Sequence, residues 1–234
     1  MKILAIDTSA TVASASLCED DEPIAVYSQK SGITHSQTIL PMIRDLMRNT
    51  GMTIDDIDMM AVSAGPGSFT GVRIGISTIK GLAFGKNKIC VGVSTLEAMA
   101  WSIASFCIDA LVCPVMDARR GQLYTAVFKP YDGKLIRLMP DSLISAEELS
   151  ERLDAYDKPV YFTGDGYGII EAMSPSFMRE TPKHARWQSG YGVAIAALES
   201  YRLAEDKSIF TDVLLRPEYL RPSQAERELA GHTI

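Results

Sequence analysis

The chain has 234 residues and a mass of 25.6 kDa, with 47% hydrophobic and 22% charged residues, as in a globular protein of one large domain or two small ones. Its 23 Lys and Arg against 29 Asp and Glu leave a formal net charge of −6, which argues against a protein that grips nucleic acid by itself. The apolar run at residues 110–116 is far shorter than the roughly 20 residues of a spanning helix, so we expect no membrane segment.

Short apolar runs alternate with stretches of helical periodicity through the first hundred residues, which predicts three strands followed by helix, strand, helix and strand. Pro41 lies inside the first helical stretch, so we expect that helix either to start late or to kink there. Gly51 follows it as a C-cap. Strands are expected at residues 2–6, 12–18, 24–29, 59–64 and 88–93, and helices at 36–49, 72–84 and 95–106.

The second half of the chain repeats this plan, with strands expected at residues 110–116, 123–128, 134–139 and 159–163 and helices at 145–155 and 191–204. Two landmarks recur. Asp7 and Asp117 each end the first strand of a half, and Gly65 and Gly164 each end a later strand. We therefore predict an α/β fold of two tandem units, residues 1–106 and 107–234, each a mixed sheet flanked by helices. The last helices are expected to pack back on the first unit.

Polar or glycine-rich loops follow two of the predicted strands. Asp7, Thr8 and Ser9 stand at a strand end, where ligands bind in open α/β folds, although a turn capped by Asp7 explains them equally well. Residues 65–71 lie between a strand and a helix, where free N–H groups can receive an anion. A tight turn that admits a closely packed helix is the alternative. The spacing matches neither a P-loop nor the full dinucleotide fingerprint.

The sequence offers little for a metal. Its three histidines are scattered, and its four cysteines lack Cys-x-x-Cys spacing and lie in apolar stretches. This pattern favours buried thiols in a reducing cytoplasm and no metal or cofactor.

The two predicted helices at residues 36–49 and 72–84 carry apolar side chains on more than one face. The residues that give this pattern are Leu40, Met42 and Met47 in the first helix and Ile74 and Leu82 in the second. Either a buried helix pair or a partner surface explains this pattern.

The sequence resembles the bacterial TsaB (YeaZ) family at residues 3–9 (Ile-Leu-Ala-Ile-Asp-Thr-Ser) and 65–75 (Gly-Pro-Gly-Ser-Phe-Thr-Gly-Val-Arg-Ile-Gly). Weaker matches at residues 35–41, 92–96, 116–119 and 218–221 extend the resemblance over nearly the whole chain. It implies an actin-like ATPase (ASKHA) fold of two RNase H-like subdomains. It also implies a role in making N6-threonylcarbamoyladenosine in tRNAs that read codons beginning with adenine.

In that family the related TsaD subunit performs the transfer, TsaB pairs with TsaD, and a small ATPase, TsaE, joins them. TsaD holds its metal with a His-x-x-x-His pair, and the matching positions here are Thr95 and Met99, which cannot replace two imidazoles. The resemblance therefore implies a non-catalytic cytoplasmic subunit that contacts tRNA only through the complex. The alternatives are an ATPase or phosphotransferase, or an M22-type peptidase-like protein acting on its own.

We expect this chain to form a helix bundle with a TsaD-like subunit or, in isolation, with a second copy, and we expect Ile76→Glu to prevent assembly without unfolding the chain. The tail after Pro217 is interpreted as an arm over the partner or as a frayed end. A vestigial nucleotide cleft is expected at Asp7, Thr8, Ser9, Gly65, Gly67, Asp117 and Gly164. The expected interface residues are His35, Ile39, Leu40, Met42, Ile43, Met47, Val72, Arg73, Ile76, Ile79 and Lys80.

Overall fold

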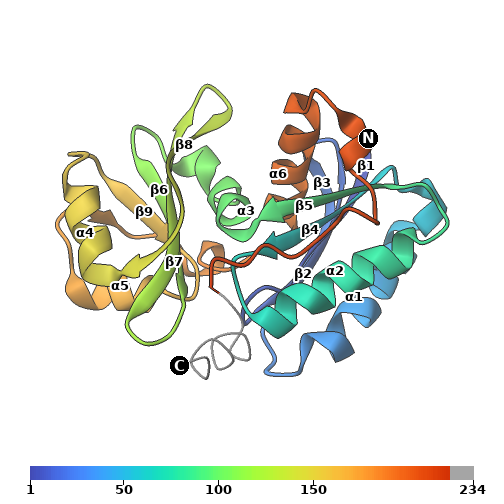
Figure 1. The fold of residues 1–234 in the computed structure, drawn as a ribbon, viewed down its shortest axis with the longest axis horizontal. Helices are drawn as coiled ribbons and strands as arrows, with labels where there is room; N and C mark the ends of the chain where they lie inside the picture. The colour runs from blue at the N-terminus through green and yellow to red at the C-terminus, as the bar shows by residue number, and fades with distance from the viewer. Residues whose placement is uncertain (222–234) are drawn as a thin grey trace, which may run out of the picture.

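The computed structural model describes residues 1–221 as two α/β lobes that lie side by side (Figure 1). In the first lobe the sheet order is β3-β2-β1-β4-β5, with β2 antiparallel to β1 and β3, and β1, β4 and β5 parallel. Its elements are β1 (Lys2–Asp7), β2 (Ala13–Glu19), β3 (Glu22–Gln29), α1 (His35–Thr50), β4 (Met59–Gly65), α2 (Phe69–Ala83), β5 (Ile89–Ser94) and α3 (Thr95–Trp101).

The second lobe has the same plan, because its sheet order β8-β7-β6-β9-β10 reproduces that of the first sheet strand for strand. Helices also follow the corresponding strands in both lobes. The prediction of a duplicated α/β unit with mixed sheets is confirmed. Its elements are β6 (Leu111–Asp117), β7 (Gln122–Tyr131), β8 (Lys134–Ser145), α4 (Ala146–Asp154), β9 (Val160–Thr163), α5 (Tyr167–Met173), β10 (Met178–Arg179) and α6 (Gly190–Leu203).

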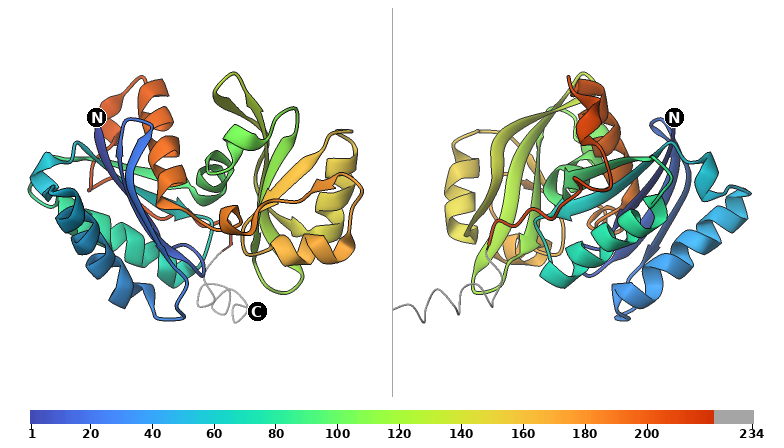
Figure 2. Two further views of the ribbon diagram at one scale, coloured as in Figure 1. Left: turned by 180° about the vertical axis from the view of Figure 1, so that it is seen from behind. Right: turned by 45° about the vertical axis from the view of Figure 1, so that its right-hand side comes forward.

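Each face of the first sheet buries a different helix pair. The even positions of β1, such as Leu4 and Ile6, pack against α1 and α2, whereas Ile3 and Ala5 pack against α3 and α6. This alternation is the period of two that a strand imposes on its side chains. Helix α6 thus returns to the first lobe after the second lobe is complete, while α4 and α5 cover the outer face of the second sheet (Figure 2).

Several boundaries differ from the sequence predictions. Helix α1 begins at His35, ahead of Pro41, so the expected late start is wrong. Helix α2 begins at Phe69 because the Ser68 side chain caps it, accepting a hydrogen bond from the Gly71 N–H. Helix α3 ends at Trp101 and only a short 3₁₀ turn, Ala104–Phe106, follows.

The last described segment, residues 211–221, which we call the strap, leaves the first lobe and runs across to the second (Figure 1). Residues 218–221, the described part of the tail after Pro217, contact this chain itself and so do not fray, whereas the arm over a partner stays a prediction. The rest of the tail lies outside the described residues. Among residues 1–221, no helix is both long and apolar enough to cross a membrane.

Candidate functional site: the α1/α2 face and the strand-end loops

The carboxylate of Asp7 is wholly enclosed at the end of β1. Its Oδ1 accepts hydrogen bonds from the Ser9 N–H (2.8 Å) and the Ser9 hydroxyl (2.7 Å), and its Oδ2 accepts one from the Ser63 hydroxyl (2.5 Å). Burial raises the pKa of Asp7, although these hydrogen bonds favour the charged form. Thr8 and Ser9 are also buried, so the expected cleft offers no open surface at these three residues.

Two N–H groups of the glycine-rich loop, those of Ser68 and Gly71, are already used by the chain. The Ser68 N–H donates to the Ser9 carbonyl at 2.7 Å, and the Gly71 N–H donates to the Ser68 hydroxyl. The Thr8 hydroxyl in turn donates to the Gly71 carbonyl at 2.7 Å. An anion needs unpaired donors at a helix start, and these two donors are already paired.

The glycines of this loop allow close packing between backbones. A Cβ on Gly71 would lie 2.1 Å from the Thr8 carbonyl oxygen, and one on Gly67 would lie 2.5 Å from that of Ser9. Of the two alternatives for residues 65–71, this geometry favours the tight turn that admits a packed helix. Helix α2 can therefore sit directly on the loop after β1.

In the second lobe, Asp117 and Gly164 correspond to Asp7 and Gly65 of the first, and both are engaged within their own lobe. Asp117 accepts from the Arg119 N–H at 2.8 Å and forms a 3.1 Å ion pair with the Arg119 side chain. Its carboxylate is thus engaged by its own lobe, as Asp7 is by the first. Gly164, like Gly65, has a positive φ, and a Cβ there would lie 2.1 Å from the Val115 carbonyl oxygen. Gly164 therefore serves a close approach of backbones.

The strap closes the first lobe's strand ends from outside. The Glu218 N–H donates to the Ala64 carbonyl at 2.8 Å, and a Cβ on Gly65 would lie 2.0 Å from the Glu218 carbonyl oxygen. Tyr219 then stacks on Phe69 with ring centroids 4.8 Å apart. On the second lobe the Arg221 guanidinium donates to the Ala118 carbonyl at 2.8 Å. The strap thus joins the two lobes at the place where a cleft was expected.

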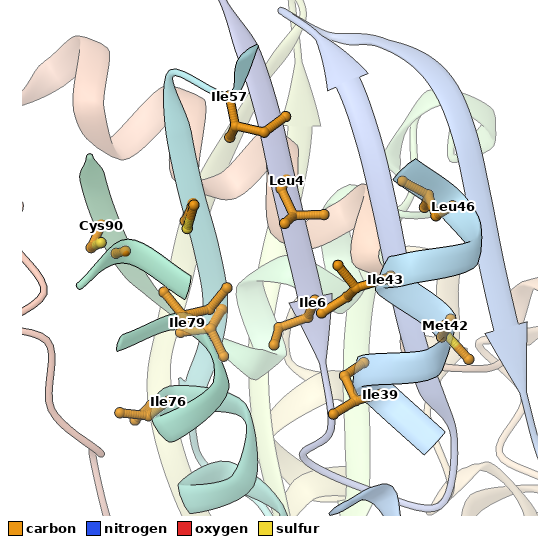
Figure 3. Close-up of a cluster of buried hydrophobic side chains, with 14 of the residues drawn as sticks. Leu4, Ile6, Ile39, Met42, Ile43, Leu46, Ile57, Ile76, Ile79 and Cys90 are labelled. Carbon is orange, nitrogen blue, oxygen red and sulfur yellow. The ribbon is translucent and has the colours of Figure 1, made fainter. Parts of the chain in front are cut away.

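Most of the expected interface residues belong to the first lobe's core. Figure 3 shows Ile39, Met42, Ile43, Ile76 and Ile79 in one buried cluster with Leu4 and Ile6 of β1. Met47 and Val72 are buried in the same cluster. The buried faces of these side chains cover the sheet of their own lobe, although Ile43 and Met47 also reach an open groove on the outer side of the two helices. The expectation that Ile76→Glu leaves the fold intact is therefore wrong, since Ile76 is only 5% exposed.

The outward side of the same two helices carries an apolar groove of about 570 Å³, which we call the α1/α2 groove. Leu40, half exposed, lies on one wall, and Leu82 of α2 on the other. The groove is open, and its lining is mostly apolar. It is lined by Leu40, Pro41, Ile43, Arg44, Met47, Thr53, Ile54 and Leu82.

Three polar residues of the expected interface make contacts within the chain. The His35 ring lies 2.6 Å from the Ala10 carbonyl, which fixes the start of α1 on the loop after β1. The exposed Arg73 side chain donates from Nε to the Tyr219 hydroxyl at 2.9 Å. The Lys80 ammonium reaches the Val213 carbonyl at 3.5 Å. Arg73 and Lys80 therefore contact the strap from α2.

Sequence reasoning noted Leu82 but missed Arg44, Thr53 and Ile54 as groove residues, and it missed Tyr219. The spacing of Ile74, Thr78 and Leu82 by four residues was the available signal for a second stripe on α2. No local signal marks Tyr219, because its contacts are with residues about 150 positions earlier.

The positions that match the TsaD metal pair lie in packed surroundings. Thr95 and Met99 are both fully buried on α3, and the Met99 sulfur lies 3.6 Å from the Gln188 amide nitrogen. Among residues 1–221, no group of three His, Cys, Asp or Glu side chains lies close enough to hold a metal ion. A hydroxyl and a thioether are a poor ligand pair for iron or zinc.

Comparison with known proteins gives matches over most of the chain. A family model described as TsaD: tRNA N6-adenosine threonylcarbamoyltransferase matches residues 25–228. The tRNA threonylcarbamoyladenosine biosynthesis protein TsaB of Bacillus subtilis (strain 168) is 32% identical over 97% of this chain and 96% of its own. The solved structure of YeaZ from Pseudomonas aeruginosa aligns with a TM-score of 0.74 at 25% identity, covering 94% of this chain and 99% of that one.

A more distant structure shares the fold alone. Component A of (R)-2-hydroxyglutaryl-CoA dehydratase from Acidaminococcus fermentans aligns with a TM-score of 0.52 at 13% identity, covering 86% of this chain and 98% of that one. The two-lobed actin-like ATPase fold expected from the sequence is thus confirmed.

Proposed function

Because the chain belongs to the TsaB family of tRNA threonylcarbamoyladenosine biosynthesis proteins, we propose that it is a non-catalytic subunit of the machinery that makes this modification. The modified tRNAs are those that read codons beginning with adenine. The chain acts by binding a TsaD-like catalytic subunit, which a TsaE-like ATPase joins, and it meets tRNA only as part of that complex.

The α1/α2 groove is the observation that carries this proposal. It presents Leu40 and Leu82 to the outside between two helices whose inner faces are already committed to the sheet. Burial of exposed apolar area contributes about 25 cal/mol per Å² to association. A helix pair from a partner would fill the groove and complete a bundle of four helices. The partner is a TsaD-like subunit, and a second copy of this chain binds the same groove in competition when that subunit is absent.

The geometry of the loops after β1 and β4 supports a non-catalytic role for this chain. An ATPase or phosphotransferase needs a carboxylate that reaches a metal–nucleotide complex and donors that hold phosphate. Asp7 is 0% exposed, and the Ser68 and Gly71 N–H groups of the glycine loop are paired with the chain. A peptidase of the M22 type would need a metal pair where Thr95 and Met99 stand. These observations favour the binding role over either enzyme.

The test is a reconstitution of tRNA threonylcarbamoylation in which each component is omitted in turn. We expect the modified nucleoside, measured by mass spectrometry after nuclease digestion, only when this chain and the TsaD-like subunit are both present. The Leu82→Glu variant should lose most of the activity, because its carboxylate would have to be desolvated in the groove. Ile169→Glu, a change at a 38% exposed position on α5 of the other lobe, is the matched control and should retain it.

Two results would contradict the proposal. Transfer of the group by this chain alone would make it an enzyme, and an undiminished reaction without it would remove it from the pathway. Full activity of Leu82→Glu with loss in Ile169→Glu would move the interface to the second lobe.

A further inference from the structure

A second groove, which we call the interlobe groove, lies between the lobes away from α1 and α2. The turn between β7 and β8 stands on one side of it and α6 on the other, with α3 between them (Figure 1). Its volume is about 560 Å³, close to that of the α1/α2 groove. Residues of both lobes line it, so its shape depends on how the lobes are joined.

The groove has an apolar and aromatic lining. Trp101 from the end of α3 and Tyr191 from α6 lie half buried in it, and Tyr131 stands at the hairpin. Ile108 is 86% exposed and adds an apolar side chain to the aromatic lining of the groove. The indole N–H of Trp101 is buried and has no hydrogen-bond partner among residues 1–221.

Four carboxylates, those of Asp21, Asp109, Asp132 and Glu199, outnumber the two cations Lys134 and Arg202 in the lining of the interlobe groove. Glu199 and Asp109 are engaged by Arg202 (2.9 Å) and Lys158 (3.0 Å). Asp21 from the first lobe and Asp132 from the second form no ion pair within residues 1–221. Burial is the main cause of a raised pKa at Tyr191, and the negative charges of Asp21 and Glu22 add to it. The open end of the groove is thus negative.

We propose that the interlobe groove binds a basic segment of a partner protein, with one apolar or aromatic side chain seated among Trp101, Tyr191 and Ile108 and flanking Lys or Arg side chains paired with Asp21 and Asp132. The apolar lining supplies the anchor, and the rim supplies the preference for cations. This surface is separate from the α1/α2 groove, so one chain can hold two partners at once.

The charge of the rim argues against the other occupants. The phosphates of RNA and the head groups of anionic lipids would be repelled by Asp21 and Asp132. A second copy would bring the same acidic rim against this one, and like charges at an interface disfavour association. A segment that carries positive charge is the occupant that the groove attracts.

The test uses Trp101 as the reporter. The chain has two tryptophans, and Trp187→Phe leaves Trp101 alone in the groove wall. This variant is titrated with a synthetic peptide that has a leucine and a phenylalanine flanked by two arginines and a lysine. Counterpart peptides carry three glutamates or three serines in place of the basic residues. We expect a saturable change in Trp101 emission with the basic peptide, weakened by added salt.

Two groove variants and one control complete the design. The double change Asp21→Asn and Asp132→Asn removes the unpaired charges, and we expect binding about ten-fold weaker at low salt. Ile108→Ser removes the exposed anchor contact, and a loss of about ten-fold is again expected. The control is Glu151→Gln with Asp154→Asn on α4, which removes two exposed charges far from the groove and should bind as the parent does.

Three results of the peptide titrations would overturn the proposal. No saturable signal with the basic peptide up to millimolar concentration would overturn the proposal. Equal binding of the acidic or the serine peptide, or an unchanged affinity in both groove variants, would overturn it as well. The affected residues are exposed, so circular dichroism is expected to show an unchanged fold in every variant, and a lost signal then reports on the groove.

Discussion

Substitutions at two neighbouring residues of α1 are expected to affect different properties, the stability of the fold in one case and association with a partner in the other. Ile39 is 1% exposed and packs on the sheet, whereas Leu40 is 50% exposed and lines the α1/α2 groove. Placing a glutamate at each position introduces the same side chain on two different faces of one helix, about 100° apart. We expect Ile39→Glu to unfold the chain and Leu40→Glu to leave it folded but unable to associate through the groove.

The magnitudes follow from burial. At Ile39 the change loses about 1.5–3 kcal/mol of apolar transfer energy and adds a penalty of several kcal/mol for a buried charge. That sum is comparable with the free energy of unfolding of a whole domain, which is ~5–15 kcal/mol. Leu40 is half exposed, so Leu40→Glu costs the folded state only about half of the apolar transfer energy of a leucine. The new glutamate also forms an i,i+4 ion pair with the exposed Arg44, which stabilises the fold by about 0.3–0.5 kcal/mol.

A partner in the groove would bury the half of the Leu40 side chain that is exposed in the free chain. Leu40→Glu removes this contact, which weakens binding by about 1 kcal/mol, and the cost of desolvating the new carboxylate raises the loss of binding free energy to at least ~3 kcal/mol. A penalty of that size corresponds to a rise of about 100-fold in Kd.

The measurements are urea unfolding for stability and sedimentation velocity for self-association, with calorimetric titration of a TsaD-like subunit as the second binding assay. Ser36→Glu, an exposed change on the same helix outside the groove lining, is the control and should behave as the parent in all three. Unchanged association of Leu40→Glu would refute the role of the groove. A folded Ile39→Glu that merely fails to associate would refute the assignment of that side chain to the core.

The remaining predictions concern the loops, the strap and the thiols. Gly71→Ala should destabilise the chain by several kcal/mol because its Cβ would meet the Thr8 carbonyl oxygen at 2.1 Å, whereas Gly81→Ala, with nothing within 4 Å, should stabilise it by about 0.5–1 kcal/mol in chemical unfolding. Equal effects would disprove the packing role. Asp7 has a raised pKa in the folded state, so its contribution to the free energy of unfolding is greatest below its unfolded pKa of 3.8. This contribution is lost as the pH rises through the pKa of the folded state. The stability of the parent relative to Asp7→Asn should therefore fall as the pH rises above about 4, and a difference that grows with pH would contradict this sign. Tyr219→Ala removes an exposed stacking contact and a hydrogen bond worth about 1 kcal/mol, and should speed hydrogen exchange in residues 211–221 more than elsewhere; uniform acceleration would argue against a distinct strap. The four buried cysteines, whose thiol pKa values burial raises to about 11 or 12, should resist iodoacetamide at pH 8 until the chain unfolds, and labelling of the folded chain would contradict their burial.

Local periodicity carried most of the fold prediction. Buried strands such as β1 and β4 read as short apolar runs, and α1 shows helical spacing because its inner face covers the sheet. The region after β9 escaped prediction, since α5 has seven residues and β10 only two, too few for a period to emerge. The landmarks Asp7, Asp117, Gly65 and Gly164 sufficed to reveal the duplication.

The candidate site was only partly accessible from the sequence. Periodicity located α1 and α2, yet it could not tell which of their apolar stripes meets the sheet, because both Ile39 and Leu40 are suitable core residues. The glycine loop was likewise open to two interpretations. Its function as a packing surface depends on Thr8 and Ser9, which come from another part of the chain.

The sequence by itself determined the order of the strands and helices as far as β9, the tandem repeat and the absence of a His-x-x-x-His pair, because these are properties of neighbouring residues. The tertiary structure decided which faces are covered, that the Asp7 carboxylate is enclosed, and that Glu218 and Arg221 tie the lobes together. Those features arise where segments up to about 150 residues apart come into contact, and no local pattern records which distant backbone will supply the partner.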